Sequence, residues 1–265
     1  MRQKLRHIYL SALGWFMKPK PGIYIINSHY VTAGIIDLKR DLQIFDKYLS
    51  NLNKCGHFIT LEDATDRIIQ GNIPTDKTLI TFTFDDGFEE CYTIIAPLLE
   101  KYNTRGAFFI NANYIESATD YQERFNQRTL TFSKKPMTWE QVRSLHQRGH
   151  LIGSHNLDHT NFAELDDNEI EYQTKENKNI LESKLNYQCD YFAWTYGQLQ
   201  HFPINALQIV KKHHPYIFSG TNYKKYFSFN REVINRRHQE AFWPTTHNKY
   251  FISIKKQYET SYRCK

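Results

Sequence analysis

Residues 80–87 have the sequence Ile-Thr-Phe-Thr-Phe-Asp-Asp-Gly. Thr, Ile and Phe favour strands, so this run predicts a buried strand over residues 79–84. Asp85, Asp86 and Gly87 do not suit the interior of a strand and are expected at its carboxyl end. Parallel α/β folds place their chemistry at these strand ends, which makes both carboxylates candidate functional groups. Taken alone, the same residues are explained equally well by a turn without function.

A second strand-like segment followed by polar side chains occurs at residues 149–159, Gly-His-Leu-Ile-Gly-Ser-His-Asn-Leu-Asp-His. Its Leu-Ile pair predicts a short buried strand, and His155 and His159 follow it. A spacing of four residues allows two imidazoles to reach one point. Together with the Asp86 carboxylate they form a set of two histidines and one carboxylate, which leaves coordination positions for water and substrate. The pattern therefore favours a metal site over two structural histidines.

Strand-like and helix-like segments alternate along the rest of the chain. This alternation indicates an α/β protein with a parallel sheet. Residues 112–136 show no clear period and predict an inserted loop that forms a wall or lid over the cleft. Further strands are expected at 22–30, 56–61, 107–110, 190–194 and 217–220, and helices at 37–53, 62–70, 89–102, 139–148, 166–185 and 203–212.

Two of these motifs resemble those of the polysaccharide deacetylase family, also known as the NodB-homology or carbohydrate esterase family 4 group. Residues 83–87 match its first motif, Thr-Phe-Asp-Asp-Gly, without a change. Residues 155–159 resemble its second motif, His-Ser/Thr-x-x-His, with Asn156 in place of Ser or Thr. The resemblance extends from about Gly22 to about Arg237. It implies a distorted (β/α) barrel with about seven strands, so residues 22–265 are expected to form one catalytic domain after an N-terminal segment at residues 1–21.

A third motif is similar but altered. Residues 192–197, Phe-Ala-Trp-Thr-Tyr-Gly, resemble the Phe-Ala-Tyr-Pro-Tyr-Gly form of one branch of the family. Ala193 stands where the other branch has Arg, and Thr195 replaces the Pro. By analogy with this motif, the backbone around Tyr196, with Trp194 beside it, is expected to contact the substrate and stabilise the oxyanion.

The resemblance also implies roles for the two main motifs. Asp86, His155 and His159 would hold a divalent metal, in the first place Zn²⁺, with Co²⁺, Mn²⁺ and Ni²⁺ as alternatives. Such an ion lowers the pKa of bound water and polarises the acetyl oxygen. Asp85, beside the metal ligand, would act as the general base.

The general acid is less easily assigned, because the family uses a late histidine whose local motif is not recognisable here. His29 ends the expected strand at 22–30, where the family often has a Tyr-His pair, and His247 is the leading late candidate. Arg236 lies in a run that resembles a Leu-Pro-Arg stretch of the family, and it is expected to orient Asp85 or an acidic sugar, a surface arginine being the alternative. The remaining candidates for the acid are His213, His214 and His238.

The composition excludes several other classes of protein. The 265 residues carry a net charge of +6, and the Lys and Arg residues are scattered, so no nucleic-acid-binding module is expected. Cys55, Cys91, Cys189 and Cys264 form no CxxC pair, which argues against a cysteine zinc site. Free thiols in a reducing compartment are the expectation.

The N-terminal segment is basic at Arg2, Lys4 and Arg6 and then apolar over residues 8–17. It is too short to span a bilayer and lacks a small-residue cleavage site. Three alternatives remain: a docked structural helix, an interfacial contact with a membrane, and a signal peptide. No other segment is long and apolar enough to span a membrane.

The sequence therefore predicts a metal-dependent hydrolase that removes N-acetyl groups from the amino sugars of a cell-surface polysaccharide or of its lipid- or nucleotide-linked precursor. A cytoplasmic location, with peripheral membrane contact, is expected. The first alternative is a secreted or periplasmic enzyme acting on chitin oligomers, peptidoglycan or exopolysaccharide. The others are an O-acetyl esterase and a non-catalytic sugar-binding protein, the latter suggested by Asn156, Ala193 and Thr195.

Overall fold

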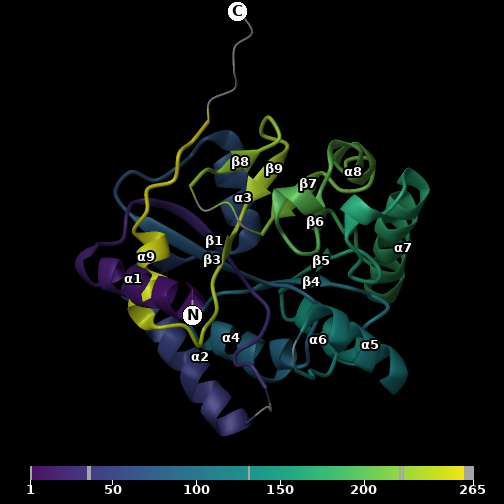
Figure 1. Ribbon diagram of the computed structural model, residues 1–265, viewed down its shortest axis with the longest axis horizontal. Coiled ribbons are helices and arrows are strands. Elements are labelled where there is room, and N and C mark those ends of the chain that lie inside the picture. Colours follow the sequence, from purple (N-terminus) through teal and green to yellow (C-terminus); the bar gives the residue numbers. More distant parts are fainter. Residues whose placement is uncertain (1, 35–36, 131, 221, 223, 260–265) are drawn as a thin grey trace, which may run out of the picture.

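The computed structural model describes residues 2–34, 37–130, 132–220, 222 and 224–259, and one sheet organises them. The strand order is β10-β1-β3-β4-β5-β6-β7-β9-β8, with β2 paired to β3 off this path (Figure 1). The strands are β1 (Gly22–Ser28), β2 (His57–Phe58), β3 (Thr78–Phe84), β4 (Ala107–Ile110), β5 (Leu151–Ser154), β6 (Tyr191–Ala193), β7 (Tyr216–Ser219), β8 (Phe227–Ser228), β9 (Val233–Asn235) and β10 (Arg237–His238).

Helices connect most of these strands and cover the outside of the sheet. They are α1 (Arg2–Phe16), α2 (Leu38–Asn53), α3 (Leu61–Gln70), α4 (Ala96–Lys101), α5 (Thr119–Thr129), α6 (Trp139–Gln147), α7 (Asp167–Leu185), α8 (Ile204–Val210) and α9 (Thr245–Ile252). In Figure 1, α1 and α9 lie together on one flank of the molecule, and α7 and α8 lie together on the other.

The sheet forms a distorted (β/α) barrel, as the sequence predicts. Every ladder is parallel except the one between β8 and β9. β1 pairs with the whole length of one edge of β3. The opposite edge of β3 pairs with β2 near its start and with β4 near its end. Seven strands run from β1 to β9 along the sheet, and within the described ranges no ladder joins β8 to β10.

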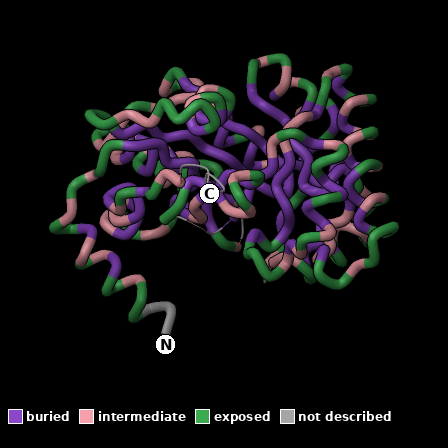
Figure 2. The backbone as a smooth tube through the Cα atoms, turned by 90° about the horizontal axis from the view of Figure 1, so that it is seen from above, coloured by how far each residue is buried: buried purple, intermediate pink, exposed green. Residues whose placement is uncertain are grey.

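The two faces of the sheet bury different clusters because side chains alternate along each strand. Ile23 and Ile25 of β1 lie in the inner cluster, which Phe109 of β4 and Phe218 of β7 also join. The intervening residues Tyr24 and Ile26 pack outward, against α2 and α4. Figure 2 shows the buried strands running through the centre with the exposed residues around them. This two-layer core fixes the strand ends that carry the site.

One expectation about the elements is wrong, and several elements were not predicted. Residues 112–136 are not a loop throughout, since they contain α5; only Phe125 and Asn126 of this helix are buried, and so it leaves no apolar period in the sequence. The last strands and α9 were not predicted, because β8, β9 and β10 are two or three residues long. Such short strands give little pattern to recognise.

The N-terminal segment is a helix that packs on α9. A Cβ atom added to Gly14 would lie 1.8 Å from the carbonyl oxygen of Thr246, so glycine permits this close approach. The opposite side of α1 exposes large apolar residues: Leu5, Ile8, Tyr9, Trp15 and Phe16. Among the described residues, no helix is both long and apolar enough to cross a membrane.

Candidate active site

Asp86 lies directly after β3 and provides the first carboxylate of the site. Its φ of 76° is left-handed, which is uncommon for a residue with a side chain and is frequent at functional positions. The Oδ1 atom lies 3.3 Å from Nε2 of His159 and 3.5 Å from Nε2 of His155. The ligand atoms of these three buried residues all lie within 4.8 Å of one another. The structure therefore brings the three predicted metal ligands together.

Backbone contacts orient His155 toward this point. Its Nδ1 lies 2.7 Å from the carbonyl oxygen of Ala193. A carbonyl only accepts, so Nδ1 carries the proton and the lone pair of Nε2 faces Asp86. Burial lowers the pKa of His155 to about 4, although Asp85 and Asp86 act in the opposite direction. The ring is therefore neutral near pH 7, as a metal ligand must be.

The loop between His155 and His159 is stabilised by Asn156 and Thr195, two residues that differ from those at the same positions of the family motifs. Asn156 has a φ of 52°, a conformation that asparagine adopts more readily than serine or threonine. Its Oδ1 accepts a hydrogen bond from the backbone N–H of His159 at 2.7 Å. Thr195 donates its hydroxyl to the carbonyl oxygen of Thr160 at 2.5 Å, a bond that proline could not make. Both substitutions thus stabilise the loop that positions His159.

The donor atoms present fit a divalent cation. Asp86 Oδ1 is buried, and no described group donates a hydrogen bond to it. The two nearby imidazole nitrogens lie beyond the 2.7–2.9 Å typical of a charged hydrogen bond. A buried acceptor left in this way costs about 1–3 kcal/mol unless something compensates it. A cation bound by one oxygen and two nitrogens would satisfy all three atoms, and Zn²⁺, Co²⁺, Mn²⁺ and Ni²⁺ all accept such ligands.

Asp85 is held by Arg236 in a buried two-pronged ion pair. The Nη1–Oδ1 and Nη2–Oδ2 distances are 2.7 and 2.8 Å. Arg236 also donates to the carbonyl oxygen of Ser219 and to the hydroxyl of Thr83, and its guanidinium lies 5.0 Å from the Phe109 ring centre. Burial alone would raise the pKa of Asp85, but the charge and hydrogen bonds of Arg236, together with the nearby His155 and His29, hold that pKa well below its usual range. Arg236 is thus a buried partner of Asp85 and not a surface residue.

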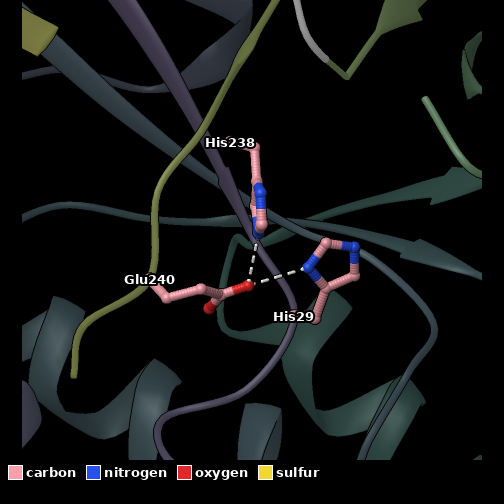
Figure 3. Close-up of side chains that lie close together, drawn as sticks. All are labelled: His29, His238 and Glu240. Atoms are coloured by element: carbon pink, nitrogen blue, oxygen red, sulfur yellow. Dashed lines mark hydrogen bonds and ion pairs between the residues drawn. The ribbon is translucent and has the colours of Figure 1, made fainter. Parts of the chain in front are cut away.

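His29 lies just past β1 and joins a third group of polar side chains (Figure 3). Its Nδ1 lies 2.9 Å from Oε1 of Glu240, and Nε2 of His238 lies 2.7 Å from the same oxygen. The other oxygen of Glu240 accepts a hydrogen bond from the Ser28 hydroxyl. The Nε2 atom of His29 points away from Glu240 (Figure 3).

The charge of Glu240 changes the protonation of this group. Burial by itself lowers the pKa of His29, but the hydrogen bond and charge of Glu240, together with the charges of Asp86 and Asp85, raise it to about 9. Burial likewise raises the pKa of Glu240, but its bonds to His238 and His29 bring it down to about 2. His29 is therefore protonated and Glu240 ionised near pH 7.

These groups surround one cavity of about 290 Å³. Tyr196 forms part of its rim, with 41% of its surface exposed and its ring centre 4.9 Å from that of His159. Thr129 and Leu130, at the end of α5, also line the cavity, so the inserted segment forms part of its wall as predicted. The cavity is also lined by Asp85, Asp86, His155 and His159, and by His29, His238 and Glu240.

Trp194 does not line this cavity. It is buried, its ring stacks on Phe202 with 4.3 Å between ring centres, and its Nε1 donates to the carbonyl oxygen of Gln198. It follows β6 on the side of the strand that packs against α8. The prediction that Trp194 contacts the substrate is therefore wrong, and this residue packs in the core instead.

His247 also lies outside the cavity. It belongs to α9, where it stacks on Trp243 at 4.8 Å, and its Nδ1 lies 2.7 Å from Nδ1 of His7 in α1. The structure therefore contradicts the prediction that His247 supplies the general acid. His213 and His214 are likewise elsewhere, bonded to Glu171 and to the carbonyl oxygen of Cys189.

Glu240 was missed in the sequence, although one signal was present. His238 and Glu240 are two residues apart, so in extended chain they face the same side. β1 and β10 are parallel neighbours, with Asn27 opposite His238. This pairing brings Glu240 to His29, which is more than 200 residues away in the chain.

The comparisons with known proteins agree with this architecture. The family model for polysaccharide deacetylase matches residues 72–214, more than half of the chain. One relative is YxkH of Bacillus subtilis (strain 168), which is named as a polysaccharide deacetylase. The two sequences are 22% identical over 196 residues, which cover 73% of this chain and 64% of YxkH.

Solved structures with the same fold include two with high coverage. The deacetylase PplD of Streptococcus pyogenes, in complex with acetate, matches with a TM-score of 0.68 and 16% identity, over 88% of this chain and 99% of that one. IcaB of Ammonifex degensii matches with a TM-score of 0.66 and 19% identity, over 89% and 99% of the two chains. This chain belongs to the polysaccharide deacetylase family.

Proposed function

We propose that this protein is a metal-dependent hydrolase that removes N-acetyl groups from amino sugars. One observation carries the proposal: Asp86, His155 and His159 converge around an unsatisfied carboxylate oxygen, and Asp85 lies beside them, held by Arg236. A deacetylase needs a water molecule with a lowered pKa, a base that accepts its proton and an acid that protonates the leaving amine. The cavity contains candidates for each part.

A divalent ion held by Asp86, His155 and His159 would lower the pKa of water and polarise the acetyl carbonyl. Asp85 would accept a proton from water; its depressed pKa keeps it ionised, and Arg236 fixes its orientation. The protonated His29 donates from Nε2 to the departing amine while Glu240 holds its Nδ1. The backbone of Tyr196, at the rim, stabilises the negative charge that forms on the acetyl oxygen.

We propose a cell-surface polysaccharide, or its lipid- or nucleotide-linked precursor, as the substrate. The half-exposed ring of Tyr196 offers a flat surface on which a sugar can stack, and polar groups line the rest of the cavity. We propose a cytoplasmic location, with which Cys55, Cys91 and Cys189 agree, since they form no disulfide within the described part of the chain.

We propose further that α1 contacts the surface of an anionic membrane. Its exposed side carries Trp15 and Phe16, which are 71% and 84% exposed, and Lys18 and Lys20 follow on exposed chain. Apolar side chains next to basic ones are typical of helices that lie in the membrane interface. Sedimentation with anionic and with neutral vesicles tests this; equal binding to both, or none, would contradict it.

Acetate release from N-acetylglucosamine oligomers tests the reaction itself. The wild type should release acetate, and Asp85→Asn should lose release while it retains the metal content of the wild type. His247→Gln is a matched control, because this histidine lies outside the cavity. Wild-type release by Asp85→Asn would contradict the assigned base. An O-acetylated sugar tested in parallel distinguishes the esterase alternative, which predicts a preference for that sugar.

A further inference from the structure

His29, His238 and Glu240 form a second group of potential metal ligands. Within the described part of the chain, only two groups of three or more such side chains bring their ligand atoms within 4.8 Å of one another, and the other is Asp86, His155 and His159. Both groups consist of two imidazoles and one carboxylate. Figure 3 shows that the two rings of the second group approach a single oxygen of Glu240 from different directions.

The backbone holds these three residues in place. The register pairs Ile26 with Arg237 and Asn27 with His238, so β1 and β10 end side by side. The N–H of Gln239 donates to the carbonyl oxygen of Asn27 at 2.9 Å and continues this pairing. The second oxygen of Glu240 accepts from Ser28, as the outer oxygen of a metal-bound carboxylate commonly does. The chain therefore positions the ligands before any ion arrives.

The group also has room for the remaining ligands of an ion. All three residues line the cavity, and the His238 side chain is 40% exposed, whereas Glu240 is almost fully buried. The His155 and His159 side chains are only 2% and 8% exposed. An ion at the second group would thus be open to water on one side and would exchange more readily than one held by the buried group.

We propose that His29, His238 and Glu240 form a second site for a divalent cation of the zinc class, weaker than the site at Asp86. In the absence of the ion, each imidazole donates a hydrogen bond to Glu240 Oε1. A cation takes the place of these two hydrogens and binds His29 Nδ1, His238 Nε2 and Glu240 Oε1. The Nδ1 proton of His29 passes to solvent, the proton on His238 Nε2 is replaced by one on its Nδ1, and no other bond forms or breaks.

This second site has a consequence that rests on the proposed function. With an ion on Nδ1, the proton on Nε2 of His29 belongs to a neutral imidazole, which is a far weaker acid than the imidazolium. His29 could then no longer protonate the departing amine. Excess zinc should therefore inhibit a protein that requires the first zinc for activity.

Zinc titration of the full-length, tag-free chain after chelation tests the site. Calorimetry should detect two equivalents for the wild type, one for His238→Gln and one for Asp86→Ala. His247→Gln is the control and should bind two equivalents, since its histidine belongs to neither group. Circular dichroism of each variant checks that the chain is folded. A single equivalent in the wild type, or two in a folded His238→Gln, would overturn the proposal.

Acetate release at increasing zinc separates this site from the proposed function. Excess zinc should inhibit the wild type and should inhibit His238→Gln less. Two equivalents in the wild type and one in His238→Gln, with no acetate release from any variant, would support the second site and contradict the proposed reaction.

Discussion

Glu240→Gln isolates the charge that keeps His29 protonated. Glutamine retains the size of the side chain and one oxygen that can accept a hydrogen bond, but it removes the negative charge. The pKa of His29 is about 9 in the wild type, against an ordinary value of 6.5. Burial lowers the pKa of this ring, whereas Asp86 and Asp85 still raise it, so without the Glu240 charge we expect a value closer to 6.5. A full shift of about 2.5 pH units corresponds to roughly 3 kcal/mol, which is the upper limit of the effect.

The same change should make stability depend differently on pH. Because the pKa of His29 is raised in the folded state, the interaction stabilises the fold fully below about pH 6.5 and is lost as the pH rises through about 9. Glu240 remains ionised over this whole range, since its pKa is about 2. Glu240→Gln should therefore be less stable than the wild type by up to roughly 3 kcal/mol near pH 6, and the difference should shrink above pH 9.

Two measurements on the chelated protein test this reasoning. Nuclear magnetic resonance follows the His29 ring through a pH titration, with His29→Gln used to assign its signal. Urea unfolding near pH 6 and near pH 9.5 gives the difference in free energy of unfolding. A wild-type His29 that titrates near 6.5, or a stability difference that is the same at both pH values, would refute the role assigned to Glu240.

Other variants test further contacts of the site. Arg236→Ala leaves Asp85 buried without its partner and should lower the free energy of unfolding by about 3–5 kcal/mol, measured in urea; a loss under about 1 kcal/mol would contradict the buried pair. Asn156→Ala removes the bond to the His159 N–H and a residue suited to positive φ, and should cost about 1–3 kcal/mol and weaken zinc binding in calorimetry. Unchanged zinc affinity would show that Asn156 does not position His159. His247→Gln should retain the acetate release of the wild type, because His247 packs between α1 and Trp243. A large loss of kcat in this variant would make His247 a candidate for the general acid again.

The sequence predicts most strongly where a buried strand meets polar residues. The end of β3 and the end of β5 were each recognisable from apolar residues followed by carboxylates or histidines, and parallel pairing brings them to one edge. The alternation of strands and helices predicted the parallel sheet, and the barrel was implied by the family resemblance. The helix α5 could not be predicted because it is polar on nearly all sides and is held by few buried residues.

Side-chain partners across distant strands are harder to predict. The bond between His29 and Glu240 depends on β10 returning beside β1, and β10 has only two residues. Trp194 was misplaced because the direction of a side chain just past a strand depends on one residue of register. His247 could not be distinguished from His29 in the sequence, since the choice depends on where α9 packs. These features are decided by tertiary contacts that leave no local pattern.

Acetate release from N-acetylglucosamine oligomers, measured before chelation, after chelation and after one equivalent of zinc is returned, tests whether the reaction depends on the metal. Release should stop on chelation and resume with the first equivalent in the wild type, and His155→Ala should stay inactive throughout. Release that continues at the same rate in the chelated protein, or in His155→Ala, would contradict a metal-dependent reaction at Asp86, His155 and His159.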